Sequence, residues 1–411
     1  MHSLFAGFRA VLGALLALSV AAGLAHAQSA APLTLTEALR RVEAGSPHIA
    51  AAEASVRAAE GRARQAGYSP NPEARLEVEN ALGSGPYEGL DSSEATLAIG
   101  QTLELGGKRR ARSNAALAEV AVARAELAIA RAEAASEVRG VYAEAVAASE
   151  RLALTEDAVT RATELARIAA KLVEEGREPP LRAYRALSAA SDAAAARDAA
   201  RAEAAASTRA LAGLLGDDGG SYTLSDSDAF APPPVATLDP TETLDVKLAE
   251  LELAAARARV ELERTGRVPD LTVEGGVRHF RGSGDTAFVA GVSMPIPIRN
   301  RNQGSIAAAQ AEATGAEAKR NLALAHATRA IRDAQAALAA ADSRLKTLRD
   351  FSLPQSQEAV RLARLGYQEG EFNLLDVLDA EEALAQARQG LIDAELARAK
   401  ALAALERAAA Q

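Results

Sequence analysis

The sequence repeats itself once, and this duplication limits the folds that it can adopt. Residues 35–216 and 238–409 each read as a helix, two short alternating segments, a very long helix and a return helix. Segments 47–67 and 246–266 align, and each runs into a glycine followed by a proline. Internal repetition has to be recognised before a fold is assigned, because it changes the architecture. Each half supplies only two strands, which limits what those strands can do.

Composition favours long helices over a thick globular core. The 411 residues are 49% hydrophobic but only 3% aromatic, with no tryptophan. Much of this hydrophobic content is alanine, which buries little area and is the best helix former. The net charge of -9 argues against nucleic acid as the main partner. The lack of cysteine excludes disulfides, cysteine-bound metals and a lipidated N-terminal cysteine.

The first 27 residues have the pattern of a secretory signal, with Arg9, an apolar stretch over 11–22 and Ala25-His26-Ala27 as the cleavage site. An ordinary N-terminal helix is the alternative. No later run reaches the ~18 apolar residues of a membrane helix. We therefore expect an exported chain without a helical span. It divides into a signal sequence (1–27), a first repeat (28–216), a glycine- and proline-rich linker (217–240) and a second repeat (241–411).

Periodicity and turn residues predict the elements of each repeat. We expect helices over 35–66 (with an interruption at Ser46-Pro47), 108–173, 181–215, 241–265, 304–370 (with a kink at Pro354) and 374–409, and strands over 73–80, 93–105, 270–280 and 286–298. In the second long helix, leucine or isoleucine recurs every seven residues, with a companion three positions later. This coiled-coil seam comprises Leu324, Ile331, Leu338 and Leu345 with Ala327, Ala334, Ala341 and Leu348.

The strands pose a physical problem. Two isolated hairpins are only marginally stable in water, whereas strands of about ten residues have the length to cross an outer membrane. An open sheet cannot span lipid, because its edge groups stay unsatisfied. Four strands cannot close a membrane barrel, so several chains must combine. Eight, twelve and sixteen strands from two, three or four copies all remain open on this argument.

Three stretches resemble one known family. They are the strand-to-helix junctions 101–109 and 294–303, the segment 367–370 followed by 374–380, and the whole element order. Together they resemble the TolC-type outer-membrane efflux proteins, and the junctions are most similar to the heavy-metal (CzcC-like) branch. The resemblance implies a homotrimer in the outer membrane of a Gram-negative bacterium, with a twelve-stranded barrel above a helical periplasmic tunnel. It also implies a periplasmic adaptor and an inner-membrane RND pump as partners, with heavy-metal cations as cargo.

The resemblance further implies that 367–380 forms the constricted inner end of the tunnel, with Tyr367, Phe372, Asp376 and Asp379 at the gate. Asp376 and Asp379 share a helix face, so a trimer would stack them as two acidic rings that favour cations. A solvated aspartate pair is the alternative. Phe372 stands where a known member of that family has arginine, so a Tyr–Arg–Asp latch is unavailable. The expectation is then either closure by apolar contact around Phe372 or a gate that opens more easily. Glu174, Glu175 and Arg177 hold the corresponding place in the first half.

A second candidate site is a set of basic residues at the starts of the long helices: Lys108, Arg109, Arg110, Arg299 and Arg301. Cations at a helix start oppose the helix dipole, so something else should favour them. We expect phospholipid head groups where barrel becomes tunnel; a turn with solvated charges is the alternative.

Nothing in the sequence indicates an enzyme, a cofactor or a metal-ligand cluster, since the histidines are isolated. Two other functions compete with the efflux duct. One is a soluble periplasmic coiled-coil scaffold or adaptor, and the other is the same duct serving drug efflux or type I secretion.

Overall fold

The computed structural model describes residues 32–217, 222–225 and 238–411, and these form two compact units. Unit 1 takes the described residues of 32–41, 141–231 and 348–396, and unit 2 those of 42–140, 232–347 and 397–411. Each unit draws on both sequence repeats. The signal sequence predicted over 1–27 and most of the linker predicted over 217–240 lie outside the described residues.

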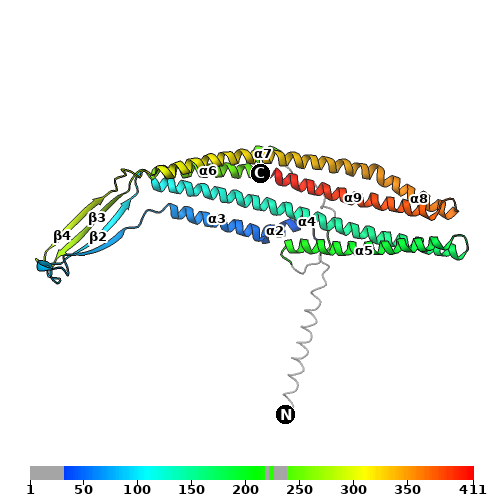
Figure 1. The fold of residues 1–411 in the computed structure, drawn as a ribbon, viewed down its shortest axis with the longest axis horizontal. Helices are drawn as coiled ribbons and strands as arrows, with labels where there is room; N and C mark the ends of the chain where they lie inside the picture. Colours follow the sequence, from blue (N-terminus) through cyan, green and yellow to red (C-terminus); the bar gives the residue numbers. More distant parts are fainter. Residues whose placement is uncertain (1–31, 218–221, 226–237) are drawn as a thin grey trace, which may run out of the picture. The chain divides into compact units, whose positions relative to one another are not determined.

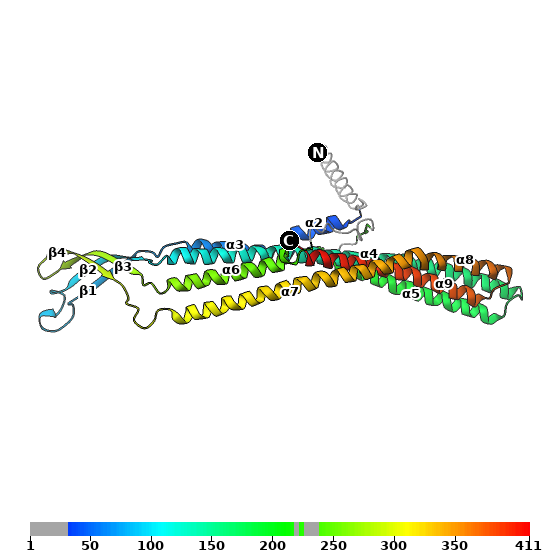
Figure 2. The same cartoon turned by 90° about the horizontal axis from the view of Figure 1, so that it is seen from above.

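Unit 2 contains one antiparallel sheet with the strand order β1-β2-β3-β4. The strands are β1 (Glu73–Glu79), β2 (Glu94–Leu103), β3 (Leu271–Phe280) and β4 (Thr286–Ser293), and they lie side by side in Figures 1 and 2. Pairing of β2 with β3, for example Leu97 with Val277, joins the two predicted hairpins. Each hairpin thus stabilises the other. Within the described part of the chain, the outer edges of β1 and β4 have no partner strand.

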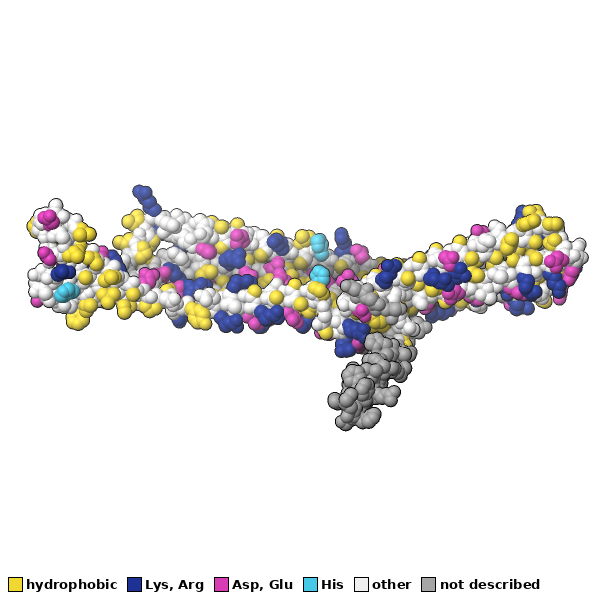
Figure 3. All heavy atoms as spheres, turned by 90° about the horizontal axis from the view of Figure 1, so that it is seen from below, with side chains coloured by type: hydrophobic (Ala, Val, Ile, Leu, Met, Phe, Trp, Pro, Cys, Tyr) yellow, Lys and Arg dark blue, Asp and Glu magenta, His cyan; other side chains and the backbone are white. Residues whose placement is uncertain are grey.

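The two faces of this sheet differ in polarity, as the alternation over 73–80 and 93–105 predicted. One face presents Leu76, Leu97 and Phe288 to solvent, with 71%, 53% and 92% of each exposed. Figure 3 shows hydrophobic side chains gathered over this part of the molecule. The other face is charged and carries Glu73, Arg75, Glu77, Glu79, Glu94, Glu274 and Arg278. So large an exposed apolar face marks a surface that another phase or molecule covers.

The helices of unit 2 pack through small side chains. They are α3 (Pro47–Ala66), α6 (Leu244–Thr265), α7 (Gln303–Thr347), the first part of α4 (Lys108–Glu174) and the end of α9 (Leu374–Ala408). Ala59 of α3 packs on Val120 and Ala123 of α4, while Ile331 of α7 packs on Leu405 of α9. Every position of the predicted seam is buried or half-buried: Leu324, Ala327, Ile331, Ala334, Leu338, Ala341, Leu345 and Leu348.

Unit 1 is also helical and contains most of α2 (Leu35–Gly45), the second part of α4, α5 (Pro180–Leu214), α8 (Leu353–Glu369) and most of α9. In Figure 2, α4, α5, α8 and α9 run alongside one another. Arg151 of α4 pairs with Glu203 of α5 at 2.9 Å and with Asp393 of α9 at 2.8 Å. These pairs fix how the three helices lie against one another along their length.

Proline accounts for two interruptions that the sequence predicted and for one departure from the predicted elements. The helix expected over 35–66 is two helices, because Pro47 starts α3 after an extended Ser46. β4 ends at Ser293 rather than at residue 298, since Pro295 and Pro297 cannot donate to a strand ladder. The irregularity expected at Pro354 is a π-helical turn over Leu348–Ser352, consistent with the N–H that Pro354 lacks.

Candidate functional site

The first candidate site is the turn between α8 and α9 in unit 1. Gly370 closes α8 in the left-handed conformation at φ 84°, and the backbone N–H groups of Glu371 and Phe372 donate to the carbonyl of Gly366 at 2.8 and 3.1 Å. Only glycine adopts this φ without strain. The sequence therefore specifies a sharp chain reversal, and residues 367–380 lie at this end of the helical hairpin.

Phe372 lies back on its own turn. Its ring occupies the space that a Cβ at Gly366 would need, and 47% of its surface remains exposed. The exposed part of the Phe372 ring can contact a neighbouring chain, which is compatible with the predicted apolar closure of the gate. The contact of the Phe372 ring with Gly366, six residues earlier in the chain, was not visible as a sequence pattern.

Asp376 has a structural partner that the prediction missed. The Asn373 Oδ1 accepts the Leu375 N–H at 2.7 Å, and the Asp376 carboxylate accepts the Asn373 N–H at 2.8 Å. This reciprocal arrangement is a capping box at the start of α9. The Asn-x-x-Asp spacing in the sequence is the signal from which this cap could have been predicted. Asp379, one turn further on, is exposed like Asp376 but lies outside this cap.

Tyr367 anchors the turn in a small apolar cluster. It is 6% exposed and packs with Ala363, Leu374 and Val377 of its own hairpin, and with Ala169 and Ala186 of α4 and α5. Burial, followed by the nearby carboxylate of Glu178, raises the pKa of the Tyr367 phenol above its ordinary value. Its hydroxyl has no hydrogen-bond partner among the described residues. The first-half charges that act on Tyr367 are thus those of Glu178 and Arg182, whereas the sequence indicated Glu174, Glu175 and Arg177.

Charged side chains tie this hairpin to α4. Glu381 of α9 pairs with Arg161 of α4 at 3.1 Å and accepts a hydrogen bond from Arg364 of α8 at 2.7 Å. Asp157 of α4 pairs with Arg161 and also with Arg388 of α9. Burial opposes ionisation of Asp157, but its hydrogen bonds to the two arginines outweigh this and lower its pKa. A pocket of about 340 Å³ lies beside these groups.

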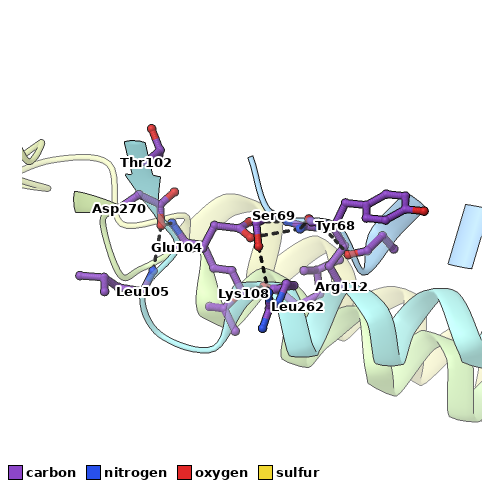
Figure 4. Close-up of polar contacts among 12 residues, drawn as sticks. Tyr68, Ser69, Thr102, Glu104, Leu105, Lys108, Arg112, Leu262 and Asp270 are labelled. Carbon is purple, nitrogen blue, oxygen red and sulfur yellow. Dashed lines mark hydrogen bonds and ion pairs between the residues drawn. The ribbon is translucent and has the colours of Figure 1, made fainter. Parts of the chain in front are cut away.

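The second candidate site is the strand-to-helix junction of unit 2 (Figure 4). Gly106 and Gly107 take φ of 70° and 78° between β2 and α4. Lys108 then pairs with Asp270 at 2.7 Å, and the Leu105 N–H donates to the same carboxylate at 3.2 Å. This ion pair offsets the unfavourable position of Lys108 at a helix start. Asp270 was missed because 162 residues separate it from Lys108.

The junction also contains Arg112, which sequence reasoning did not single out. Arg112 donates to the carbonyls of Ala66 and Tyr68, each at 2.9 Å, and pairs with Glu104. One guanidinium therefore joins the end of α3, the end of β2 and the first turn of α4. The hydrogen bonds that Arg112 donates to the Glu104 carboxylate raise the pKa of Arg112 above its ordinary value.

The predicted basic residues are divided by the structure rather than gathered. Lys108 is held by Asp270, and Arg109 donates to the Ser69 hydroxyl at 2.9 Å. Arg301 donates to the Pro297 carbonyl at 3.2 Å. Arg110 and Arg299 are exposed. Interaction with lipid remains a prediction for this set.

The described residues contain no group of three or more His, Cys, Asp or Glu placed to hold a metal ion. In the same residues, no helix combines the length and the apolar character needed to cross a membrane.

The fold agrees with comparisons to known proteins. The chain belongs to the outer membrane efflux protein family, whose model matches residues 38–217 and 241–411. It is similar to the cobalt-zinc-cadmium resistance protein CzcC of Cupriavidus metallidurans, at 30% identity over 366 residues that cover 88% of this chain and 86% of that one. The nickel-cobalt-cadmium resistance protein NccC of Alcaligenes xylosoxydans xylosoxydans is 35% identical over 328 residues, or 79% and 74% of the two chains.

Solved structures share the fold. The outer membrane protein VceC of Vibrio cholerae superposes with a TM-score of 0.76 at 23% identity, covering 91% of this chain and 95% of VceC. CusC gives 0.77 at 20% identity, covering 92% of each chain. The predicted family, fold class and localisation in the Gram-negative outer membrane are confirmed. The protein is an outer-membrane efflux channel.

Proposed function

We propose that this channel is the outer-membrane duct of a tripartite RND-type efflux system and that its cargo is heavy-metal cations. The relatives CzcC, NccC and CnrC are named for resistance to cobalt, zinc, cadmium or nickel. The observation that carries the proposal is the sheet of unit 2, with one exposed apolar face, one charged face and two edges that lack a partner strand.

A homotrimer satisfies these edges. Unpaired strand edges are not tolerated in lipid, and three copies of a four-stranded sheet give the twelve strands of a closed barrel. The apolar face then meets lipid and the charged face lines the lumen. The duct itself is passive. An inner-membrane RND pump supplies the energy for transport, and a periplasmic adaptor joins the pump to the duct.

The lumen face suits cations. It carries five glutamates (Glu73, Glu77, Glu79, Glu94 and Glu274) and two arginines (Arg75 and Arg278), so 5 − 2 leaves a net charge of −3 per chain. Acidic walls concentrate cations and repel anions. Cations would then cross the lumen by weak, repeated attraction, which permits release at the far end.

The α8–α9 turn is the proposed inner gate. Tyr367 holds the turn against α4 and α5, Phe372 offers the apolar contact, and Asp379 supplies an exposed acidic ring, while Asp376 keeps the turn in shape through its cap. Asp379→Asn should lower the cation-over-anion permeability ratio in planar bilayers. Glu382→Gln, an exposed charge one turn further along α9, is the matched control; an equal loss in both would remove Asp379 from the gate.

The proposal is tested in a deletion strain complemented with the wild-type gene. Loss of the gene should sensitise cells to cobalt, zinc or cadmium, and the protein should fractionate with outer membranes and need detergent for release. A water-soluble protein would support the scaffold alternative instead. OpmQ, a pyoverdine export protein of Pseudomonas putida, is 27% identical over 397 residues, so sensitivity to organic compounds with unchanged metal tolerance would move the cargo to that class.

A further inference from the structure

The surface next to the sheet, where the apolar face ends, contains a groove whose chemistry matches that of a phospholipid. The groove has a volume of about 680 Å³ and lies between the loop 266–270 and the loop 295–300 of unit 2. Lys108 lies at its rim, already paired with Asp270. The groove belongs neither to the gate nor to the lumen face described above.

The walls of the groove continue the apolar face. After Val292 at the end of β4, every second residue is apolar and exposed: Met294 (50%), Ile296 (77%) and Ile298 (75%). Pro295 and Pro297 stiffen this loop, and the Ile298 N–H donates to the Ile296 carbonyl at 2.9 Å. Val268 lines the opposite wall and is 37% exposed. The apolar side chains are therefore held outward by a rigid backbone.

The charges of the groove are unbalanced. Lys108 and Asp270 neutralise each other, which leaves Arg267 and Arg299, one on each loop. Both side chains are exposed, and neither has a hydrogen-bond or ion-pair partner in the described residues. Two unpaired guanidinium groups, one on each wall of an apolar groove, favour a ligand with an anionic phosphate and hydrocarbon chains.

We propose that this groove binds an anionic phospholipid of the inner leaflet, with its phosphate between Arg267 and Arg299 and its acyl chains along Ile296 and Ile298. The assignment rests on the proposed function, because the duct must lie in the membrane. Of the basic residues that the sequence predicted to bind lipid, this site uses Arg299. Arg267 takes the place of Lys108, which is paired with Asp270. The bound lipid occupies the groove between the apolar face of the sheet and the polar helices. It thereby fixes the depth of the channel in the membrane.

The test uses purified full-length protein in detergent, with helix unfolding followed by circular dichroism. Phosphatidylglycerol should raise the melting temperature more than phosphatidylcholine with the same acyl chains. Arg267→Gln with Arg299→Gln should abolish that difference while keeping the phosphatidylcholine effect. Ile296→Ser with Ile298→Ser should lower the effect of both lipids. Arg329→Gln with Arg332→Gln, two exposed arginines of α7, is the matched control and should behave as wild type.

Three outcomes would overturn the inference. They are a phosphatidylglycerol effect that survives the Arg267/Arg299 change, an equal loss in the α7 control, and inorganic phosphate alone reproducing the effect. The proposed function fails separately, if the wild-type protein is recovered in the soluble fraction without detergent. A membrane-bound protein without a phosphatidylglycerol preference leaves the duct in place and removes only the lipid site.

Discussion

Replacing Arg112 with methionine should loosen the strand-to-helix junction. Methionine keeps the length of the side chain but removes the donors to Ala66 and Tyr68, and it leaves the Glu104 carboxylate, whose side chain is only 12% exposed, without its cation. A hydrogen bond that involves a charged group contributes roughly 1.5–3 kcal/mol. Since 35% of the Arg112 side chain is exposed, water replaces part of this, and we take about 2 kcal/mol as the local loss.

Hydrogen exchange measured by mass spectrometry reports this loss directly. A loss of about 2 kcal/mol corresponds to roughly 30-fold faster opening, because each 1.4 kcal/mol is a factor of ten. The effect should appear in peptides that cover 64–70, where the Gly67 and Tyr68 N–H groups close the end of α3. Adding Glu104→Gln to Arg112→Met should recover part of the lost stability, because no carboxylate is then left without its cation.

Arg124→Met is the control for this experiment. Arg124 lies about three turns further along α4 and pairs with Glu60 at 2.7 Å, but the two side chains are 65% and 38% exposed. Surface pairs of this kind contribute about 0–1 kcal/mol, so exchange over 64–70 should not change. Wild-type exchange in Arg112→Met, or equal effects of the two substitutions, would refute the role assigned to Arg112.

Three further predictions concern unit 1. Asn373→Ala removes the α9 cap and should cost about 0.5–2 kcal/mol locally, seen as faster exchange of the Leu375 and Asp376 amides; unchanged exchange would exclude the capping box. Gly366→Ala displaces the Phe372 ring and should raise the conductance in planar bilayers if the ring closes the gate, whereas wild-type conductance would separate Phe372 from closure. The pKa of Asp157 is lowered in the folded state, so its contribution is present above the ordinary value of 3.8 and is lost as pH falls through the folded value. The melting temperature of Asp157→Asn should therefore lie below that of wild type near neutral pH and converge with it in acid; a constant difference would contradict this sign.

The element order and the faces of the strands were predictable because both are local patterns. A strand repeats every two residues, so Leu76 and Val78 fall on one face and Arg75 and Glu77 on the other wherever the strand lies. The heptad of α7 similarly placed Ile331 and Ala334 in the seam. The joining of β2 to β3 was less accessible, since it pairs segments that lie in different repeats.

The polar contacts of the two sites were harder to foresee. Lys108 had many acidic residues available, and no spacing rule pairs it with Asp270 across 162 positions. The links from Arg161 to Glu381 and from Arg364 to Glu381 join three helices in the same way. Only the cap at Asn373 and Asp376 left a readable signal, because a capping box has a fixed spacing. Sequence therefore located the turn at 367–380, but it did not reveal that Asp376 also caps α9; the gate role of both aspartates stays a prediction.

The same physics explains why arginine recurs at the ties between helices. Alanine seams bury little area per residue and look alike at successive positions, so apolar packing alone would let neighbouring helices slide. A charged pair has one correct register. Arg407 of α9 pairs with Asp245 of α6 at 2.8 Å and with Glu133 of α4 at 3.0 Å, and the hydrogen bonds that it donates to Asp245 raise its pKa. Arg151 does the same for α4, α5 and α9 within unit 1. Although exposed pairs add little free energy, they select one alignment among many that alanine would accept.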